Sequence, residues 1–505
     1  MFELPTELWL RITQFVPDVD LFRLASVNQL FLDLVTDRRY RQLIIDDDRP
    51  PILLGKLAKL HQDSSVAARV RSLTVHPKAV RSACLRSAKS VKNRIRPAKN
   101  SHWPNDFRYR STKYPIEEDV ELADKLLDAL ASLHHIEEFT IEWKQGFEAE
   151  RSFCLPLLIA IWPLVSQNVR VIKLDMMLGH MADMVSPLSG LDRVQELALN
   201  FTCHDERFGP WVGPGYEAKD AFEQLAAFTN RLAPSLQSLT ISSIGHLDFS
   251  WLYANLTCFP HLTSLSLLVP CDPRHVVDPT GLHRFLRAHH GVENLNFSPQ
   301  YCCHQSALQP EAAHGRISTE DWLARVFEGV TFSNLRSLEL GLNILGSGGK
   351  RVMLTVPRIG YAAKNVKSLT IAGCLISLED LRLLLGPFSL AGGGASPRTL
   401  VLEVHVLDVT LLDLLADLLP GLEMLDLTYR WISRFECTNA AEFTEQLRGR
   451  RYEQWKLWKL VLRCSRRNDD ARWPSQQAIS RSVPGLHWYV KYILSLFDPR
   501  LIFRT

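Results

Sequence analysis

One hydrophobic pattern recurs along most of the chain. Each copy has an apolar residue, two variable residues, a leucine or its equivalent, one variable residue and another apolar residue, as in Val70, Leu73 and Val75. Ten steps, with a mean of about 32 residues, separate the central positions from Phe139 to Leu460. Self-similarity at such a period predicts a stacked array, because each repeat can bury its apolar face only against its neighbours.

Each repeat is expected to pair one strand with one helix. The alternation inside the pattern is typical of a strand with one buried face. Apolar residues at helical spacing lie between the strands, and they predict helices over 120–133, 221–232, 319–327, 378–385 and 411–419. A strand followed by a helix at this period predicts an α/β solenoid, with parallel strands on its concave side and helices on its convex side.

Two repeats carry a longer signature. Residues 335–345 read Leu-x-x-Leu-x-Leu-x-x-Asn-x-Leu, and residues 366–376 have Cys374 where the first copy has Asn343. Either side chain can hydrogen-bond backbone groups that become exposed as the chain leaves the strand. These repeats resemble leucine-rich repeats.

The first 45 residues have a different pattern, which predicts three short helices. Leu8 lies on the apolar face of the first helix, and Pro17 ends it. We expect Asp18 or Asp20 to cap the second helix and Asn28 to cap the third. A domain of this size is marginally stable alone, so part of its apolar surface is expected to be a docking face.

This opening segment resembles the F-box. The resemblance rests on the ordered series Leu4, Pro5, Glu7, Leu8, Ile12, Pro17, Asp20, Leu21, Leu24, Val27 and Phe31. One departure lies at 28–31, where many members have a cysteine and a tryptophan, although Phe31 still supplies an aromatic residue.

An F-box implies binding to the Skp-type adaptor of a cullin–RING ubiquitin ligase. The residues that the resemblance assigns to this contact are Leu4, Pro5, Leu8, Ile12, Pro17, Leu21, Leu24 and Val27. Some of these must also hold the F-box together, and the sequence does not separate the two roles.

Taken whole, the chain resembles F-box proteins with leucine-rich repeats, a class abundant in fungi. The resemblance implies a non-catalytic substrate-recognition subunit of an SCF-type E3 ligase, acting in ubiquitin-dependent degradation. The alternative is a leucine-rich-repeat scaffold or inhibitor that binds proteins outside a ligase. A nucleic-acid binder is the less favoured reading.

The expected domains are an F-box at 1–45, a linker and connecting helix at 46–69, a solenoid at 70–465 and a C-terminal cap at 466–505. A basic insertion at about 78–113 interrupts the solenoid, with 11 basic residues and one acidic residue. It is expected to be a solvated segment whose like charges repel, and the alternatives are a nuclear-import signal or a nucleic-acid contact.

Capture of a protein substrate is expected on the concave face, through residues that flank the buried leucines. The candidates are Glu138, Thr140, Lys173, Asp175, Thr240, Asn296, Glu339, Thr370 and Asp426. Their charges have both signs, which indicates neither a phosphate pocket nor a nucleic-acid groove.

Composition and motifs narrow the function further. The chain has 505 residues, of which 46% are hydrophobic and 22% charged, and its net charge is only +3, so no global field attracts nucleic acid or membrane. The longest apolar run, 153–165, is shorter than a membrane span, and the ten cysteines lack zinc-site spacing. With no catalytic motif found, we expect no enzyme activity, cofactor, metal or membrane contact, and a cytoplasmic or nuclear location.

Overall fold

The computed structural model describes part of the chain. This part consists of residues 5–13, 15–46, 50–77, 126–143, 151–186, 190–202, 218–243, 247–269, 275–298, 319–341, 360, 362–363, 365–389, 396–432, 440–464 and 476–493. The chain divides into two compact units, Met1–His204 with Trp211–Tyr216, and Asp205–Pro210 with Glu217–Thr505.

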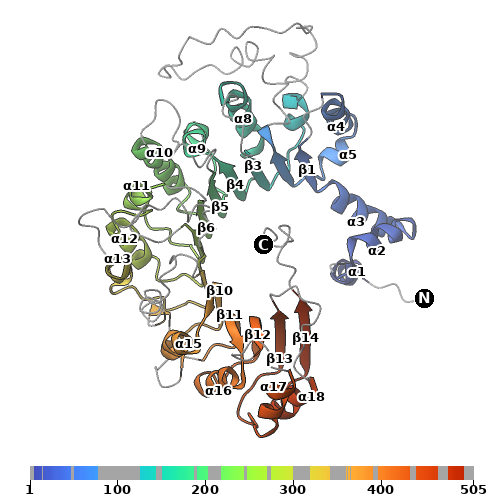
Figure 1. Cartoon of the computed structure of the whole chain (residues 1–505). Helices are drawn as coiled ribbons and strands as arrows, with labels where there is room; N and C mark the ends of the chain where they lie inside the picture. Colours follow the sequence, from blue (N-terminus) through green and yellow to red (C-terminus); the bar gives the residue numbers. More distant parts are fainter. Residues whose placement is uncertain are drawn as a thin grey trace. The chain divides into compact units, whose positions relative to one another are not determined.

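Unit 1 begins with helices and continues as a parallel sheet (Figure 1). The helices are α1 (Thr6–Thr13), α2 (Asp18–Arg23) and α3 (Gln29–Tyr40), with a 3₁₀ turn, Leu24–Ser26, between α2 and α3. The elements that follow are β1 (Gln42–Ile45), α4 (Pro50–Gln62), α5 (Ser64–Ala67), β2 (Ser72–Val75), β3 (Glu138–Glu142), α8 (Arg151–Val165), β4 (Val171–Met176), α9 (Leu178–Val185) and β5 (Glu196–Phe201). Strands β1 to β5 pair in chain order, each parallel to the next.

Unit 2 repeats the strand–helix alternation, and Figure 1 shows its helices on one face of its strands. Its helices are α10 (Ala218–Arg231), α11 (Ser250–Asn255), α12 (Thr280–Ala288), α13 (Thr319–Phe327), α15 (Leu378–Leu385), α16 (Val409–Leu418), α17 (Ala440–Arg448) and α18 (Gln476–Ser482). Its strands are β6 (Ser238–Ser243), β7 (Ser264–Leu268), β8 (Asn294–Phe297), β9 (Ser337–Gly341), β10 (Ser368–Ile376), β11 (Thr399–Leu407), β12 (Met424–Ile432), β13 (Lys459–Cys464) and β14 (Trp488–Ile493). Strands β6 to β14 also pair in chain order and in parallel.

The register aligns the central residue of every predicted pattern. In unit 1, Leu73, Phe139, Ile172 and Leu197 are register partners on successive strands. The equivalent column in unit 2 consists of Leu239, Leu265, Leu295, Leu338, Leu369, Leu400, Leu425 and Leu460. Every one of these side chains is buried. Burying one such side chain stabilises the fold by about 1.5–3 kcal/mol, so the columns hold the repeats together.

The expected fold class is confirmed: F-box helices precede an α/β solenoid of the leucine-rich-repeat type. The helices predicted at 319–327 and 378–385 coincide with α13 and α15, and those at 221–232 and 411–419 overlap α10 and α16. Asn343, residues 120–125 and the basic insertion at 78–113 lie outside the described residues.

Two local features differ from the sequence-based expectations. Strand β1 follows α3 inside the segment assigned to the F-box, where only helices were expected. Strand β14 lies in the segment expected to cap the array, and it pairs in parallel with β13. Neither Asp18 nor Asp20 caps α2, because Pro17 occupies the cap position and no side chain bonds there. The proposed domain boundaries stay predictions.

A buried histidine joins two repeats of unit 2. The Nε2 atom of His289 accepts a hydrogen bond from the backbone N–H of Phe259 at 2.8 Å. The Nδ1 atom therefore carries the proton and donates to the Phe285 carbonyl at 2.6 Å. The ring also stacks on the Phe259 ring. Burial lowers the pKa of His289 below its usual value of 6.5, so the folded state requires the neutral ring.

We expect this histidine to make unit 2 less stable in acid. Below pH 6.5 the unfolded chain binds a proton that the folded His289 site takes up only at lower pH, so stability is lost as the pH falls. Urea unfolding of the full chain at several pH values checks this. In His289→Gln, whose amide can donate and accept without titrating, the loss between pH 7.5 and pH 5.5 should be smaller. An equal loss in both proteins would contradict the expectation.

Candidate adaptor-binding surface and strand face

The F-box has a small apolar core. Leu21, Phe31 and Val35 are its buried residues, and four half-buried apolar residues, Trp9, Val16, Leu24 and Ala25, pack against them. The Trp9 ring meets the Phe31 ring edge to face, with 5.4 Å between their centroids. Such aromatic pairs add stability beyond the area that they bury, and this one joins α1 to α3.

Polar contacts fix the three helices around this core. The Asn28 side chain accepts a hydrogen bond from the Phe31 N–H at 2.9 Å, which confirms Asn28 as the cap of α3. From the other end of α3, Arg38 donates to the Thr13 carbonyl at 2.9 Å and pairs with Asp18. One guanidinium therefore holds the end of α1 and the start of α2.

Most of the remaining large apolar side chains of the F-box face solvent. The described residues contain fourteen exposed large hydrophobic residues, and eight of them lie between positions 8 and 32. We call these eight the apolar F-box surface: Leu8, Leu10, Ile12, Phe15, Val19, Phe22, Val27 and Leu32. Single exposed apolar residues are ordinary on soluble proteins, but this density within 25 positions is typical of an interaction site.

The structure separates the core residues from the exposed ones among the predicted contacts. Leu8, Ile12 and Val27 belong to the apolar F-box surface, and Val27 is 60% exposed. Leu21, by contrast, is 1% exposed and part of the core, so it is not accessible to a partner in this conformation. Leu24 is half-buried against the same core.

Three predicted contacts and five unpredicted residues remain. Pro5 and Pro17 are exposed, and Leu4 lies outside the described residues. Five residues of the apolar F-box surface were not predicted as contacts: Leu10, Phe15, Val19, Phe22 and Leu32. The resemblance missed them because none of them is a position that carries it. A helical plot would have placed only Val19 opposite a buried residue, at about 200° from Leu21.

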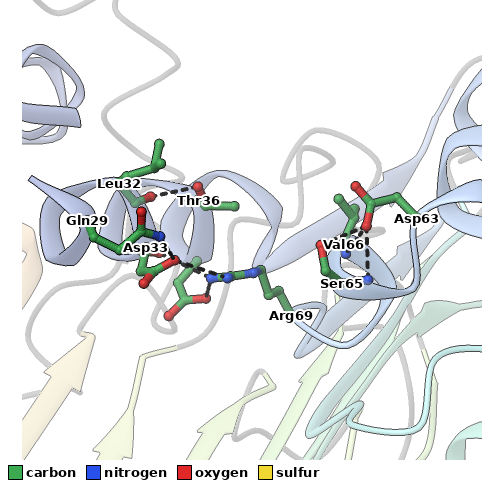
Figure 2. A network of polar contacts seen from close by, with 9 residues as sticks. Gln29, Leu32, Asp33, Thr36, Asp63, Ser65, Val66 and Arg69 are labelled. Carbon is green, nitrogen blue, oxygen red and sulfur yellow. Dashed lines mark hydrogen bonds and ion pairs between the residues drawn. The ribbon is translucent and has the colours of Figure 1, made fainter. Parts of the chain in front are cut away.

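The F-box is joined to the first repeats by polar groups. Arg69, which follows α5, donates to the Asp33 carbonyl at 3.2 Å and pairs with the carboxylates of Asp33 and Asp37 on α3 (Figure 2). The backbone N–H groups of Arg71 and Ser72 both donate to the Arg41 carbonyl, so the sheet ladder begins one residue after α3 ends.

A second ion pair stabilises the strand that follows the F-box. Lys56 of α4 donates to Asp46 at 2.9 Å, just after β1. This hydrogen bond is the main reason that the pKa of Asp46 is lowered from its ordinary value. These junction contacts are polar and partly exposed, so they orient the F-box without covering its apolar surface.

The predicted substrate-binding residues lie on the strand face, by which we mean the positions that alternate with the buried columns. In unit 1, Thr140 and Lys173 are register partners, and the Glu138 carboxylate accepts a hydrogen bond from Lys173 at 2.7 Å. Asp175 is half-buried two residues further along β4.

In unit 2 the register places the five remaining candidates in one row. That row contains Thr240, Asn296, Glu339, Thr370 and Asp426. Four of them are half-buried, whereas Asp426 is 7% exposed, and Arg463 on the neighbouring strand binds both of its carboxylate oxygens. Asp426 is therefore engaged within the fold rather than available as a free carboxylate.

Among the described residues, no group of three or more His, Cys, Asp or Glu side chains is arranged to hold a metal ion. No helix there has both the length and the apolar character needed to cross a membrane.

The arrangement is that of a helical domain with an exposed apolar surface, followed by a leucine-rich-repeat-type solenoid. Comparison with known families identifies the first part: residues 1–43 match the F-box domain. Residues 1–43 are therefore an F-box domain, and F-box proteins are generally non-catalytic adaptors.

The comparisons of the whole chain give a distant structural likeness. No curated protein matches the chain. Among solved structures, the chain is similar to a crystal structure of a TLR13–ssRNA13 complex, with 16% sequence identity and a TM-score of 0.29. The match covers 66% of this chain and 40% of that one, so the chain spans less than half of that protein's length. This likeness is too distant to indicate function.

We expect truncation of a core phenylalanine to destabilise the F-box, whereas truncation of a surface phenylalanine should leave its stability almost unchanged. Phe31→Ala should cost about 3–5 kcal/mol, because it empties a buried aromatic site in a domain with little core. Hydrogen exchange measured by mass spectrometry should show α1–α3 losing protection, while α10 keeps its own. Phe15→Ala is the matched control, since Phe15 is 87% exposed. Equal protection of α1–α3 in both variants would be evidence against the core described above.

Proposed function

We propose that this protein is a substrate-recognition subunit of an SCF-type E3 ubiquitin ligase, with no catalytic role of its own. Its F-box binds the Skp-type adaptor, and its repeats capture a target protein for ubiquitin-dependent degradation. The observation that carries the proposal is the apolar F-box surface, which remains exposed although the domain is attached to the repeats.

The exposed side chains supply what a partner helix needs. A standard protein interface buries about 1,600 Å² in total, and a few well-packed anchors provide most of its free energy. Leu8 and Ile12 lie one helical turn apart on α1, and Phe15 and Phe22 add two aromatic side chains. Covering these groups would remove apolar area from water at about 25 cal/mol per Å².

The junction suits an adaptor that must hold its target in position. Strand β1 begins two residues after α3 ends, and Arg69 clamps α3 through Asp33 and Asp37. A target bound to the repeats would then stay at a restricted distance and orientation from the ligase subunits that transfer ubiquitin. Restricting that geometry raises the effective concentration of the target's lysines, and this is the contribution that a non-catalytic subunit can make.

The strand face supports target capture in general terms. Its half-buried Ser, Thr, Asn and charged side chains are held at fixed strand spacings, so they form a pre-organised polar surface. A solenoid exposes such a surface over many repeats, which suits the recognition of a protein segment.

We expect Leu8→Asp to abolish adaptor binding while leaving the fold intact. An aspartate at this exposed position would place an unpaired charge inside the contact, at a cost of about 3–5 kcal/mol of binding free energy. Co-purification with a Skp-type adaptor and titration of the purified pair measure the loss. Leu383→Asp is the matched control, because Leu383 is also an exposed leucine on a helix but lies in α15 of unit 2.

The same titration distinguishes the proposal from its main alternative, a repeat scaffold or inhibitor that works outside a ligase. If the wild-type chain does not bind the adaptor, or if the folded Leu8→Asp chain binds it as tightly as the Leu383→Asp control, the ligase assignment fails. Circular dichroism of each variant establishes that it is folded.

A further inference from the structure

A line of charged residues borders the strand face of unit 2. From β7 to β14, the residue immediately before the strand donates its backbone N–H to the carbonyl of the equivalent residue in the preceding repeat, at 2.7–3.0 Å. This extra rung fixes the alignment of these residues at about 4.8 Å per repeat. From β9 to β13 the residues are Arg336, Lys367, Arg398, Glu423 and Trp458, which we call the rim strip.

Three consecutive cations occupy one half of the rim strip. Arg336 and Arg398 lie within 3.3 Å and 3.6 Å of Glu293 and Glu423 respectively, but both arginine side chains are 64% exposed. Ion pairs this exposed contribute little, so a ligand carboxylate can compete for either arginine. Lys367 between them is exposed and forms no ion pair with the residues that the structure describes.

An aromatic side chain, that of Trp458, lies at the other end of the rim strip. Trp458 is 41% exposed, although tryptophan is usually buried for most of its area. Tryptophan and arginine are the residue types most often found as energetic anchors of protein interfaces. The strip therefore offers charge recognition at one end and an apolar anchor at the other.

A second row of side chains runs beside the strip on the strand face. Its members are register partners and follow the rim residues by one position: Ser337, Ser368, Thr399, Met424 and Lys459. Ser337, Ser368 and Thr399 each directly follow one of the three cations in the sequence, and their hydroxyl groups can donate hydrogen bonds to carboxylates. Met424 is the register partner of Lys459, which directly follows Trp458, and its polarisable apolar side chain can extend the anchor.

From this arrangement we propose that the rim strip binds an extended acidic segment of a partner protein, with glutamates or aspartates on the cations and an apolar residue on Trp458. The strip spans four strand spacings, or about 19 Å, which an extended chain covers with about six residue steps. Calling the partner a degradation target rests on the proposed function, whereas the binding itself does not.

Carboxylates fit the strip better than phosphates do. A phosphate carries nearly two charges at one point and is usually held by cations that converge on it. Here the cations stand in a line, one per repeat, with a glutamate beyond each end. Such a line matches single charges distributed along a peptide. Those two glutamates also disfavour a long polyanion such as nucleic acid.

Fluorescence anisotropy with the full chain and a labelled seven-residue peptide tests the proposal. The probe has four glutamates, two glycines and a phenylalanine, since about three steps separate Arg336 from Arg398 and about three more reach Trp458. We expect binding that weakens with salt, because the contacts are charged and exposed. A counterpart with four lysines should not bind.

The decisive comparison is between two double charge reversals. Lys367→Glu with Arg398→Glu should weaken binding at least about tenfold, because attraction becomes repulsion at two neighbouring rungs. Arg170→Glu with Arg193→Glu is the matched control, since both arginines are exposed but lie in unit 1. Trp458→Ser should weaken binding by a factor that changes little with salt.

Several results would overturn the proposal. Equal affinity in the two double variants, once both are shown to be folded, would exclude the rim strip as the site. Binding of a phosphoserine counterpart without binding of the glutamate peptide would exclude carboxylates as its ligands. The Leu8→Asp chain should bind the peptide as the wild type does, so the strip and the ligase assignment can fail independently.

Discussion

The structure depends on the burial of one apolar column by stacking. A single repeat exposes its central leucine at both edges of its strand, and only a neighbour in matching register removes that side chain from water. The buried series from Leu239 to Leu460 shows that unit 2 meets this requirement at each repeat from β6 to β13. Once the column sets the register, the neighbours of every other strand residue are determined. The strand face and the rim strip are consequences of that packing.

The F-box meets a different constraint. With a buried core of Leu21, Phe31 and Val35, it has little apolar area to stabilise itself, and its helices rely on polar ties such as the Arg38 contacts. The Arg69 clamp to the repeats is polar as well. Polar attachments have direction but cover little area, so they can orient the domain and leave its apolar surface exposed. A hydrophobic attachment would have hidden the same side chains.

These constraints explain what the sequence could predict. The repeat period and helical spacing predicted α13 and α15 with their observed bounds, because both patterns are local and recur many times. Asn28 was predicted as a cap for the same reason, since its bond spans three residues. Strand β1 was missed because it has only four residues, and the aliphatic residue that opens the repeat pattern is not present before them. Its strand conformation depends on pairing with β2.

The burial and the partners of a side chain could not be predicted where its neighbours in space are distant in the sequence. Leu8 and Leu21 both fit the F-box pattern, yet one is exposed and the other buried, because only the packed helices define an interior. Asp426 was expected on an open face, and its partner Arg463 lies 37 positions later. Only the register between β12 and β13 brings them together. The same argument applies to the rim strip, whose members are each separated by a whole repeat.

The rim position also shows where a repeat protein is free to vary. Packing does not select its side chain, since unit 2 has glutamine, threonine, glutamate, arginine, lysine, tryptophan and histidine there. Arg336 and Arg398 gain only exposed ion pairs from the fold, and like charges at such spacing repel by a fraction of a kcal/mol in water. Glu293 and Glu423 offset part of that repulsion at the ends but leave Lys367 in the middle. The fold does not require these three cations, and their repulsion costs a little free energy. A requirement to bind a partner would explain why they are present.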